Sequence, residues 1–142
     1  VELAGGRSVK VIAGRIAVEG RELTGPINAV AGSMATDPLY VDVQLPAGAA
    51  IALPVPAGHH AFVYPFEGEV VIAGERIRQH SAAVLADGDS VHVTAGAAGA
   101  RFVLIAGRPL NEPVVQYGPF VMNTPEEIEQ AVADFRAGRL AA

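Results

Sequence analysis

Glycine and proline recur every few residues along the first 107 residues of this 142-residue chain. Both interrupt regular structure, and the runs between them are short and rich in Val, Ile, Leu and Phe. Runs of that length and composition are typical of strands rather than helices. We therefore expect about nine or ten short strands, and strands at this spacing favour an antiparallel sandwich or barrel.

The clearest expected strand is Leu39–Leu45, in which four apolar residues alternate with Tyr40, Asp42 and Gln44. Period-two alternation places the apolar residues on one face of a sheet. The other expected strands are Val9–Ala13, Ile51–Val55, Phe62–Phe66, Glu69–Ala73, Arg76–Arg78, Ala82–Ala86, Ser90–Thr94 and Arg101–Ala106.

Turn-forming residues separate these strands. Ile27–Pro38 is expected to be a loop. Phe62–Phe66 and Glu69–Ala73 are expected to pair through Glu67-Gly68, and the small residues Gly96–Gly99 are expected to form a hairpin tip. The body of the chain is thus predicted to be all-β.

Residues 108–123 are of a different kind, since they contain Pro109, Pro113 and Pro119. Proline fixes φ and removes an amide donor, so a sheet strand is disfavoured there. We expect an ordered crossing that is neither helix nor hairpin.

Residues 124–137 carry a complete set of helix signals. Thr124 is expected at the N-cap, Pro125 at the first helical position, and Glu127 completes a capping box. Apolar residues at i, i+3, i+4 and i+7 from Ile128 form one stripe, and Gly138 is expected to end the helix. The sequence therefore predicts one C-terminal α-helix.

Composition limits the partners and the chemistry. The net charge is −5 and no basic run occurs, so direct nucleic-acid binding is not expected. There is no cysteine, which excludes disulfides, thiolate metal sites and cysteine nucleophiles. No apolar run reaches the roughly 20 residues of a membrane helix, so we expect a cytoplasmic protein without membrane contact. The chain begins at Val1 without Met, which fits an excised domain or a processed fragment.

Several segments resemble the C-terminal domain of pirins, two-domain proteins of the cupin superfamily. The closing segment Arg108–Phe135 carries the most specific similarity. The other similar segments are Val11-Ile12-Ala13-Gly14, Thr36-Asp37-Pro38-Leu39-Tyr40 with Asp42, Ala61–Tyr64 with Phe66–Val70, Ala83–Leu85 with Asp87-Gly88-Asp89, and Phe102–Gly107. The resemblance implies one cupin domain over residues 1–142. It would comprise a double-stranded β-helix (jelly-roll barrel) over 1–107, the crossing over 108–123, and the helix over 124–137.

The resemblance also implies a role. Pirins carry iron in their N-terminal barrel, held by three His and one Glu, and that barrel would be the partner of this domain. The family is linked to iron-dependent quercetin 2,3-dioxygenase activity and to redox-sensitive transcriptional coregulation through protein contacts. We expect this domain to be non-catalytic, with no catalytic or cofactor-binding residue of its own, so that any such activity belongs to the intact protein.

The alternative is a self-contained metal-dependent cupin oxygenase that uses His59 or His60 with Glu67 or Glu69. A metal-binding cupin pattern has alternating His-x-His, because residues i and i+2 share a face of a strand. His59 and His60 are adjacent, so at most one can point into the barrel. His92 is expected to be exposed. Without a metal site, the barrel interior is expected to be filled by Phe62, Tyr64 or Phe66 and aliphatic residues.

Charged residues make up 18% of the chain, which is low for a soluble domain and favours a covered surface. The candidate interface residues are Gln116, Tyr117, Pro119, Phe120 and Phe135. An isolated domain with an uncovered apolar face is expected to form a homodimer at high concentration through the helix or the Gln116–Phe120 crossing. Regulatory proteins are further possible partners.

Overall fold

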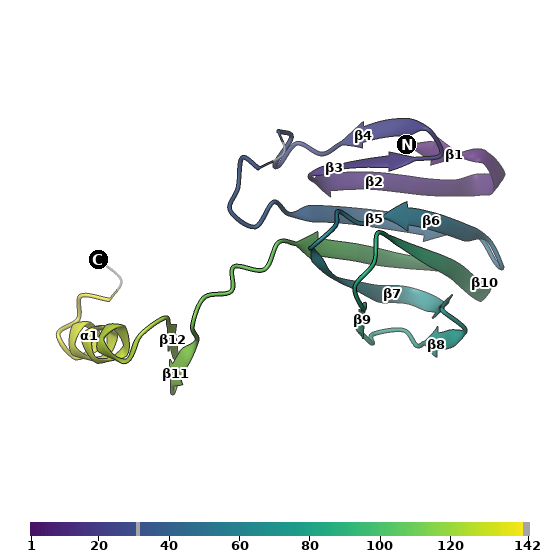
Figure 1. Ribbon diagram of the computed structural model, residues 1–142. Helices are drawn as coiled ribbons and strands as arrows, with labels where there is room; N and C mark the ends of the chain where they lie inside the picture. Colours follow the sequence, from purple (N-terminus) through teal and green to yellow (C-terminus); the bar gives the residue numbers. More distant parts are fainter. Residues whose placement is uncertain (31, 141–142) are drawn as a thin grey trace. The chain divides into compact units, whose positions relative to one another are not determined.

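The computed structural model describes residues 1–30 and 32–140 (Figure 1). The chain divides into two compact units, Val1–Pro109 and a second one that begins at Leu110. Strands dominate the first unit and the longest helix lies in the second, which confirms the prediction of an all-β protein with one C-terminal helix.

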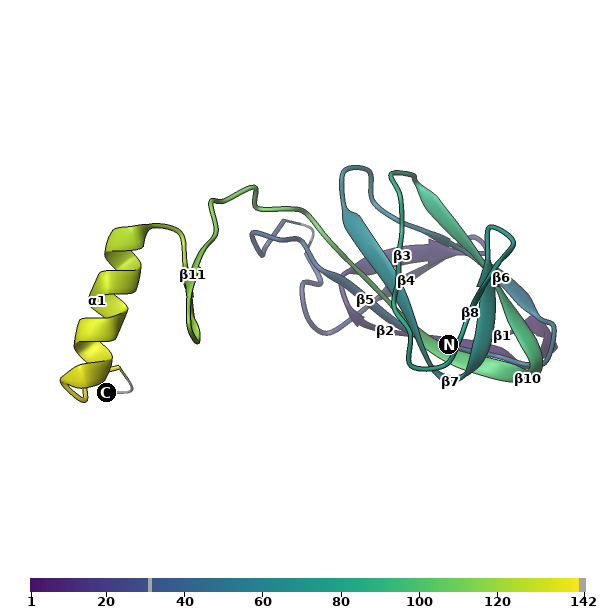
Figure 2. The same ribbon diagram turned by 90° about the horizontal axis from the view of Figure 1, so that it is seen from below.

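In its described residues, the first unit contains ten strands and one short 3-10 helix, Ala4–Gly6. The strands are β1 (Glu2–Leu3), β2 (Arg7–Ala13), β3 (Arg15–Val18), β4 (Arg21–Thr24), β5 (Leu39–Leu45), β6 (Ala50–Pro54), β7 (His60–Ile72), β8 (Glu75–Ile77), β9 (Ala83–Val84) and β10 (Ser90–Gly107). Seen from below, these strands curve around a common interior (Figure 2).

The large sheet has the strand order β1-β2-β5-β10-β7-β8, with β6 also paired to β10 and β9 to β7. Its ladders are antiparallel. Strand β10 is central to this sheet. Its first half pairs with β6, its second half pairs with β5, and β7 pairs with both halves. The β3–β4 hairpin forms a separate two-stranded sheet.

The β3–β4 hairpin was not predicted, although the sequence carries a signal for it. Ile16 and Val18 are buried and alternate with exposed residues. The turn residues Glu19 and Gly20 both have positive φ, 49° and 76°. A two-residue turn of this kind matches the twist of paired strands.

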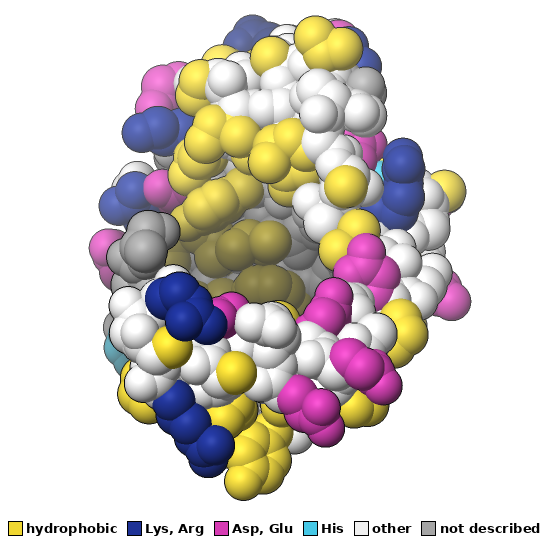
Figure 3. Space-filling view, turned by 90° about the vertical axis from the view of Figure 1, so that its left-hand side faces the viewer, with side chains coloured by type: hydrophobic (Ala, Val, Ile, Leu, Met, Phe, Trp, Pro, Cys, Tyr) yellow, Lys and Arg dark blue, Asp and Glu magenta, His cyan; other side chains and the backbone are white. Residues whose placement is uncertain are grey.

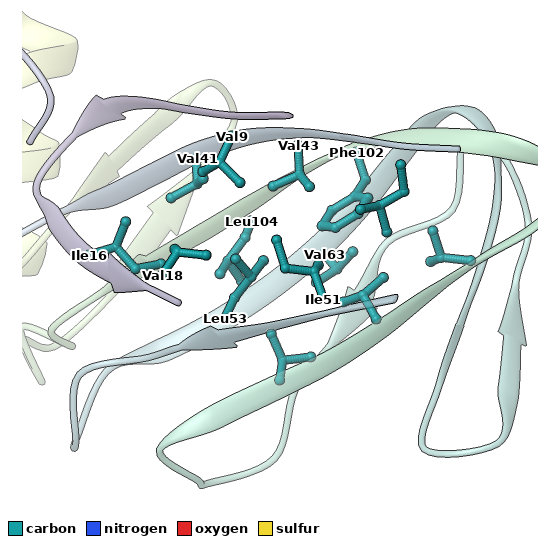
Figure 4. Packing of buried hydrophobic residues seen from close by; sticks show 14 of the residues in the cluster. Val9, Ile16, Val18, Val41, Val43, Ile51, Leu53, Val63, Phe102 and Leu104 are labelled. Atoms are coloured by element: carbon teal, nitrogen blue, oxygen red, sulfur yellow. The ribbon is translucent and has the colours of Figure 1, made fainter. Parts of the chain in front are cut away.

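Among the described residues, the hydrophobic core is aliphatic apart from one aromatic ring. The four apolar residues of β5 are at most 2% exposed, as its alternation predicted. Burial of such side chains is the main favourable contribution to folding, at roughly 25 cal/mol per Å². The core side chains point toward one another from six strands (Figure 4): Val9, Ile16, Val18, Val41, Val43, Ile51, Leu53, Val63, Phe102 and Leu104.

The prediction that Phe62, Tyr64 or Phe66 fills the interior was wrong. Along β7 it is Ala61, Val63 and Pro65 that are buried, while the three aromatic residues are half-buried. Because successive side chains of a strand point to opposite faces, the aromatic residues lie on the outer face of the sheet. Phe102 on β10 is the aromatic residue that enters the core.

The expected hairpins at Glu67-Gly68 and Gly96–Gly99 were also wrong, because β7 and β10 each run through these positions without a break. The register between them shifts between Ala95 and Ala100, so the extra residues form a bulge instead of a turn. Gly68 has φ +67°, and a side chain there would collide with the Gly99 carbonyl oxygen. Glycine at both positions therefore permits close contact of two bent strands.

The loop predicted over Ile27–Pro38 is confirmed for the part that the structure describes, where one isolated bridge pairs Ile27 with Ala13. Ala31 lies outside the described residues. The remaining predicted strands in the first unit agree with the observed ones within a few residues.

The second unit contains β11 (Val115–Tyr117), β12 (Phe120–Met122) and α1 (Pro125–Arg136). The two strands pair as a hairpin across Gly118 and Pro119, so the prediction of a crossing without a hairpin was wrong. Gly118 has φ +55°, which permits the tight turn, and Pro119 stands between the strands, where no ladder amide is needed.

The predicted helix signals are confirmed. The Thr124 hydroxyl accepts from the Glu127 backbone N–H, and the Glu127 carboxylate accepts from the Thr124 backbone N–H. At the other end, the backbone N–H of Gly138 donates to the Phe135 carbonyl oxygen, with φ +70° at Gly138. Such a glycine closes a helix because its left-handed backbone satisfies the last carbonyl groups.

Candidate functional site

His60 begins strand β7 and His59 directly precedes it, but the two side chains have different surroundings. His59 is buried, with 9% exposure, whereas His60 is exposed. The His59 Nδ1 atom lies 3.2 Å from the Pro56 carbonyl oxygen, and Nε2 lies 3.1 Å from the Asp37 carbonyl oxygen. Both ring nitrogens of His59 thus face backbone oxygens.

Asp37 is the centre of a polar cluster that the sequence analysis did not identify. Its Oδ1 atom accepts from the Gly32 backbone N–H at 2.9 Å and from the Asn28 side-chain amide at 2.8 Å. These two bonds, in that order, hold the pKa of the Asp37 carboxyl below its usual value. Its other oxygen lies 3.8 Å from both His59 Nε2 and Arg108 Nη2.

The cluster joins three parts of the first unit: the 27–38 loop, the start of β7, and the end of β10. Asn28 is buried, and its side-chain oxygen accepts from the Ser33 hydroxyl. The backbone N–H of Arg108 donates to the Thr36 carbonyl oxygen. Only the turn composition of the loop could have indicated this arrangement from the sequence.

Glu67 and Glu69, the acidic candidates, lie far from the two histidines. Glu67 is 67% exposed and its carboxylate lies 4.0 Å from Arg101, whereas Glu69 pairs with Arg76 at 2.7 Å. A strand rises about 3.3 Å per residue, so β7 separates His60 from Glu67 by roughly 20 Å. The structure does not bring the four candidate ligands together.

The other two histidines do not supply the missing ligands. His92 is exposed on β10 between buried Val91 and Val93, as the alternation predicted. His80 occupies a turn, where its Nδ1 atom lies 3.5 Å from the Tyr64 hydroxyl. Within residues 1–30 and 32–140, no group of three or more His, Cys, Asp or Glu side chains is placed to hold a metal ion.

Three cavities border the buried histidine or the polar cluster, and one of them, of about 620 Å³, is lined by His59, His60, Asp87 and Asp89 together with small residues. A second of about 470 Å³ is lined by Gly14, Ile16, Asn28, Asp37, Leu39 and Val55, among others. A third of about 280 Å³ is lined mainly by apolar residues together with His59 and His92. None of these three walls gathers an acid, a base and a nucleophile together, so the cavities offer room for small molecules without a complete catalytic triad.

The candidate interface residues lie together in the second unit. Gln116, Tyr117 and Pro119 are exposed at the β11–β12 hairpin. The rings of Phe120 and Phe135 meet edge to face with centroids 6.2 Å apart, and Phe135 remains 64% exposed. Figure 3 shows hydrophobic, acidic and basic side chains at the surface.

Comparison with known proteins identifies the relatives of this chain. Residues 40–141 match the Pirin C-terminal cupin domain family. Human pirin is 50% identical over 106 residues, which cover 71% of this chain and 37% of pirin. A pirin-like protein of Caulobacter vibrioides is 44% identical over 135 residues, which cover 95% of this chain and 46% of that protein.

A solved structure shows the same fold. Quercetin 2,3-dioxygenase from Acinetobacter baumannii superposes with a TM-score of 0.80 at 31% identity, covering all of this chain and 46% of that one. The chain thus has the cupin jelly-roll fold and spans less than half the length of these relatives. None of the helices in the described residues has the length and apolar character needed to span a bilayer.

Proposed function

Because the chain belongs to the pirin family, whose C-terminal cupin domain it matches over residues 40–141, we propose that it is the non-catalytic half of a two-domain pirin. Its role is to pack against a metal-bearing N-terminal cupin domain. The observation that carries this proposal is the dispersal of the candidate ligands along β7. His59 faces two backbone oxygens, while Glu67 and Glu69 lie beside arginines in another part of the strand.

The residues of this chain do not fit the iron that pirins carry. Three imidazoles and a carboxylate must converge within about 2 Å of one ion, and among the described residues no group of three or more His, Cys, Asp or Glu side chains is placed to do so. Iron is therefore proposed to bind in the N-terminal domain. The quercetin 2,3-dioxygenase activity and the transcriptional coregulation linked to the family would then be properties of the intact protein.

This proposal leaves the domain a structural and recognition role. The aromatic side chains of the second unit, among them Tyr117 with 68% exposure, are suited to contacts with another protein surface. A regulatory protein would be bound through such surfaces. The alternative of an oxygenase centred on His59 or His60 receives no support from the placement of Glu67 and Glu69.

Metal content and oxygen uptake test the proposal. We would compare this chain alone with a chimera in which it replaces the matching part of the Caulobacter vibrioides pirin-like protein. After chelation and reloading with Fe²⁺, the chimera is expected to retain about one iron per molecule and the isolated chain far less than one. One tightly bound metal per isolated chain and oxygen uptake with quercetin, both lost in His60→Ala but not in His92→Ala, would overturn the proposal.

A further inference from the structure

Strand β7 and the second half of strand β10 carry apolar residues on both faces. On β7, Ala61 and Val63 enter the core, while Phe62 and Tyr64 lie on the outer face. An antiparallel sheet with one face in water normally alternates apolar and polar residues. Strands that are apolar on both faces are typical of sheets that are covered on both sides.

The register aligns the outer apolar residues across four strands. Val84 on β9 pairs with Phe62 on β7, Phe62 with Ile105 on β10, and Ile105 with Tyr40 on β5. We call these four residues the outer row. With about 4.8 Å between neighbouring strands, the outer row is roughly 14 Å long.

The outer row is accessible at one end and has a groove beside it. Val84 is 83% exposed, which is unusual for an aliphatic residue in a strand. The groove has a volume of about 410 Å³ and is lined by residues that include Pro38, His60, Phe62, Val84, Ile105 and Gly107. A partner side chain of aliphatic or aromatic type would find an apolar recess here.

Charged residues border the outer row on one side. The next row of the same face contains Tyr64, Val103, Asp42 and Lys10, paired across β7, β10, β5 and β2. The Arg101 guanidinium makes two hydrogen bonds to the Asp42 carboxylate, at 3.0 and 2.6 Å. It also lies over the Phe66 ring, 5.2 Å from the centroid. An apolar, aromatic centre with a charged border that contains Arg is the usual composition of a protein–protein interface.

We propose that the outer row is the surface on which the other half of a full-length pirin docks. This inference rests on the function proposed above and adds the contact surface to it. The choice of this occupant rests on the length of the relatives. This chain covers only 46% of the Caulobacter vibrioides protein and 46% of the Acinetobacter baumannii one, so each contains a further part that could cover the outer row. A half joined to the same chain is present at a high effective concentration and occupies an apolar face before a free partner does.

Thiol labelling tests this surface, because the chain contains no cysteine. A Val84→Cys thiol is labelled by a water-soluble reagent in the isolated chain and in the chimera, and peptide mapping by mass spectrometry locates the label. The matched control is Val30→Cys, a valine of the same unit with 71% exposure that lies outside the outer row. Labelling at position 84 is expected to be at least tenfold slower in the chimera, and labelling at position 30 to change less than twofold.

Unfolding of the chimera separates the two proposals. A single cooperative transition with unchanged labelling at position 84 would overturn the outer row as the docking surface and leave the packing of the two halves intact. Two independent transitions with unchanged labelling would overturn both proposals. Protection at position 84 that appears in the isolated chain as its concentration rises would identify a second copy of this chain as the occupant and overturn the proposal that the other half of a pirin occupies the outer row.

Discussion

His59 and Asp37 are 22 residues apart in the sequence, yet the His59 Nε2 atom lies 3.1 Å from the Asp37 carbonyl oxygen and 3.8 Å from its carboxylate. The other ring nitrogen faces the Pro56 carbonyl oxygen. A neutral imidazole donates from one nitrogen and a cationic one from both, so His59 supplies at least one donor to these buried oxygens. Its position fixes the 27–38 loop against the start of β7.

His59→Ala is expected to destabilise the first unit by about 2–4 kcal/mol. The substitution removes a buried ring and leaves backbone oxygens without a donor. His60→Ala is the control: His60 is the adjacent, exposed histidine, and its loss should cost less than about 0.5 kcal/mol. Urea unfolding followed by circular dichroism measures both. Equal, small effects of the two substitutions would show that His59 does not hold the loop.

Asp37→Asn is expected to make the stability of the protein depend less on pH in the acid range. The pKa of the Asp37 carboxyl is lowered by its bonds to the Gly32 N–H and the Asn28 amide. A carboxyl with a lowered folded pKa stabilises the protein above its unfolded pKa of about 3.9, and this contribution is lost as pH falls through the folded value. Asparagine cannot ionise, so the variant should lack this contribution.

The magnitude at neutral pH follows from the bonds that are weakened. Hydrogen bonds to a charged group contribute about 1.5–3 kcal/mol, so the variant should be less stable than the parent chain by about that amount at pH 7. The difference between the two proteins should shrink below pH 4. A difference that stays constant from pH 7 to pH 3, measured by urea unfolding, would contradict this assignment.

Thr124→Ala is expected to destabilise helix α1 by about 1 kcal/mol, because the N-cap hydroxyl accepts the Glu127 backbone N–H. Amide hydrogen exchange of residues within the helix is the direct measurement, and it should become faster by roughly fivefold in the first turns. Glu129→Ala, on the same helix but outside the capping box, should leave the exchange rates near their original values. Equal exchange in both variants would show that the cap contributes nothing.

Structural features that depend on residues close together in the chain were predictable from the sequence. The capping box depends on residues three apart, and the alternation of Leu39–Leu45 reports directly which face is buried, so both predictions were confirmed. The cupin fold followed from the resemblance. The separation of the histidines followed from adjacency, since His59 is buried and His60 is not.

Features that depend on pairing partners were not predictable. The outward direction of Phe62 and Tyr64 is set by the phase of β7, and the apolar composition of Ala61–Phe66 allows either phase. The Asp37 cluster joins residues from distant segments, which no local pattern reports. Gly68 in a strand pattern can mark either a turn or a bulge, and only the approach of β10 decides between them.

Gly68→Ala therefore tests the bulge that replaced the predicted turn. Gly68 has φ +67°, and an added Cβ would meet the Gly99 carbonyl oxygen. Because backbone strain and a steric clash act together, the substitution is expected to lower the free energy of unfolding by about 2–4 kcal/mol. Gly74→Ala has a similar φ of +82° but open space around it, and should cost only the strain, about 1–2 kcal/mol. Gly88→Ala lacks both and should change stability by less than about 0.5 kcal/mol. Urea unfolding of the three variants gives the order directly. A loss of stability for Gly68→Ala no larger than that for Gly74→Ala would mean that β7 and β10 are not held in close contact at Gly68.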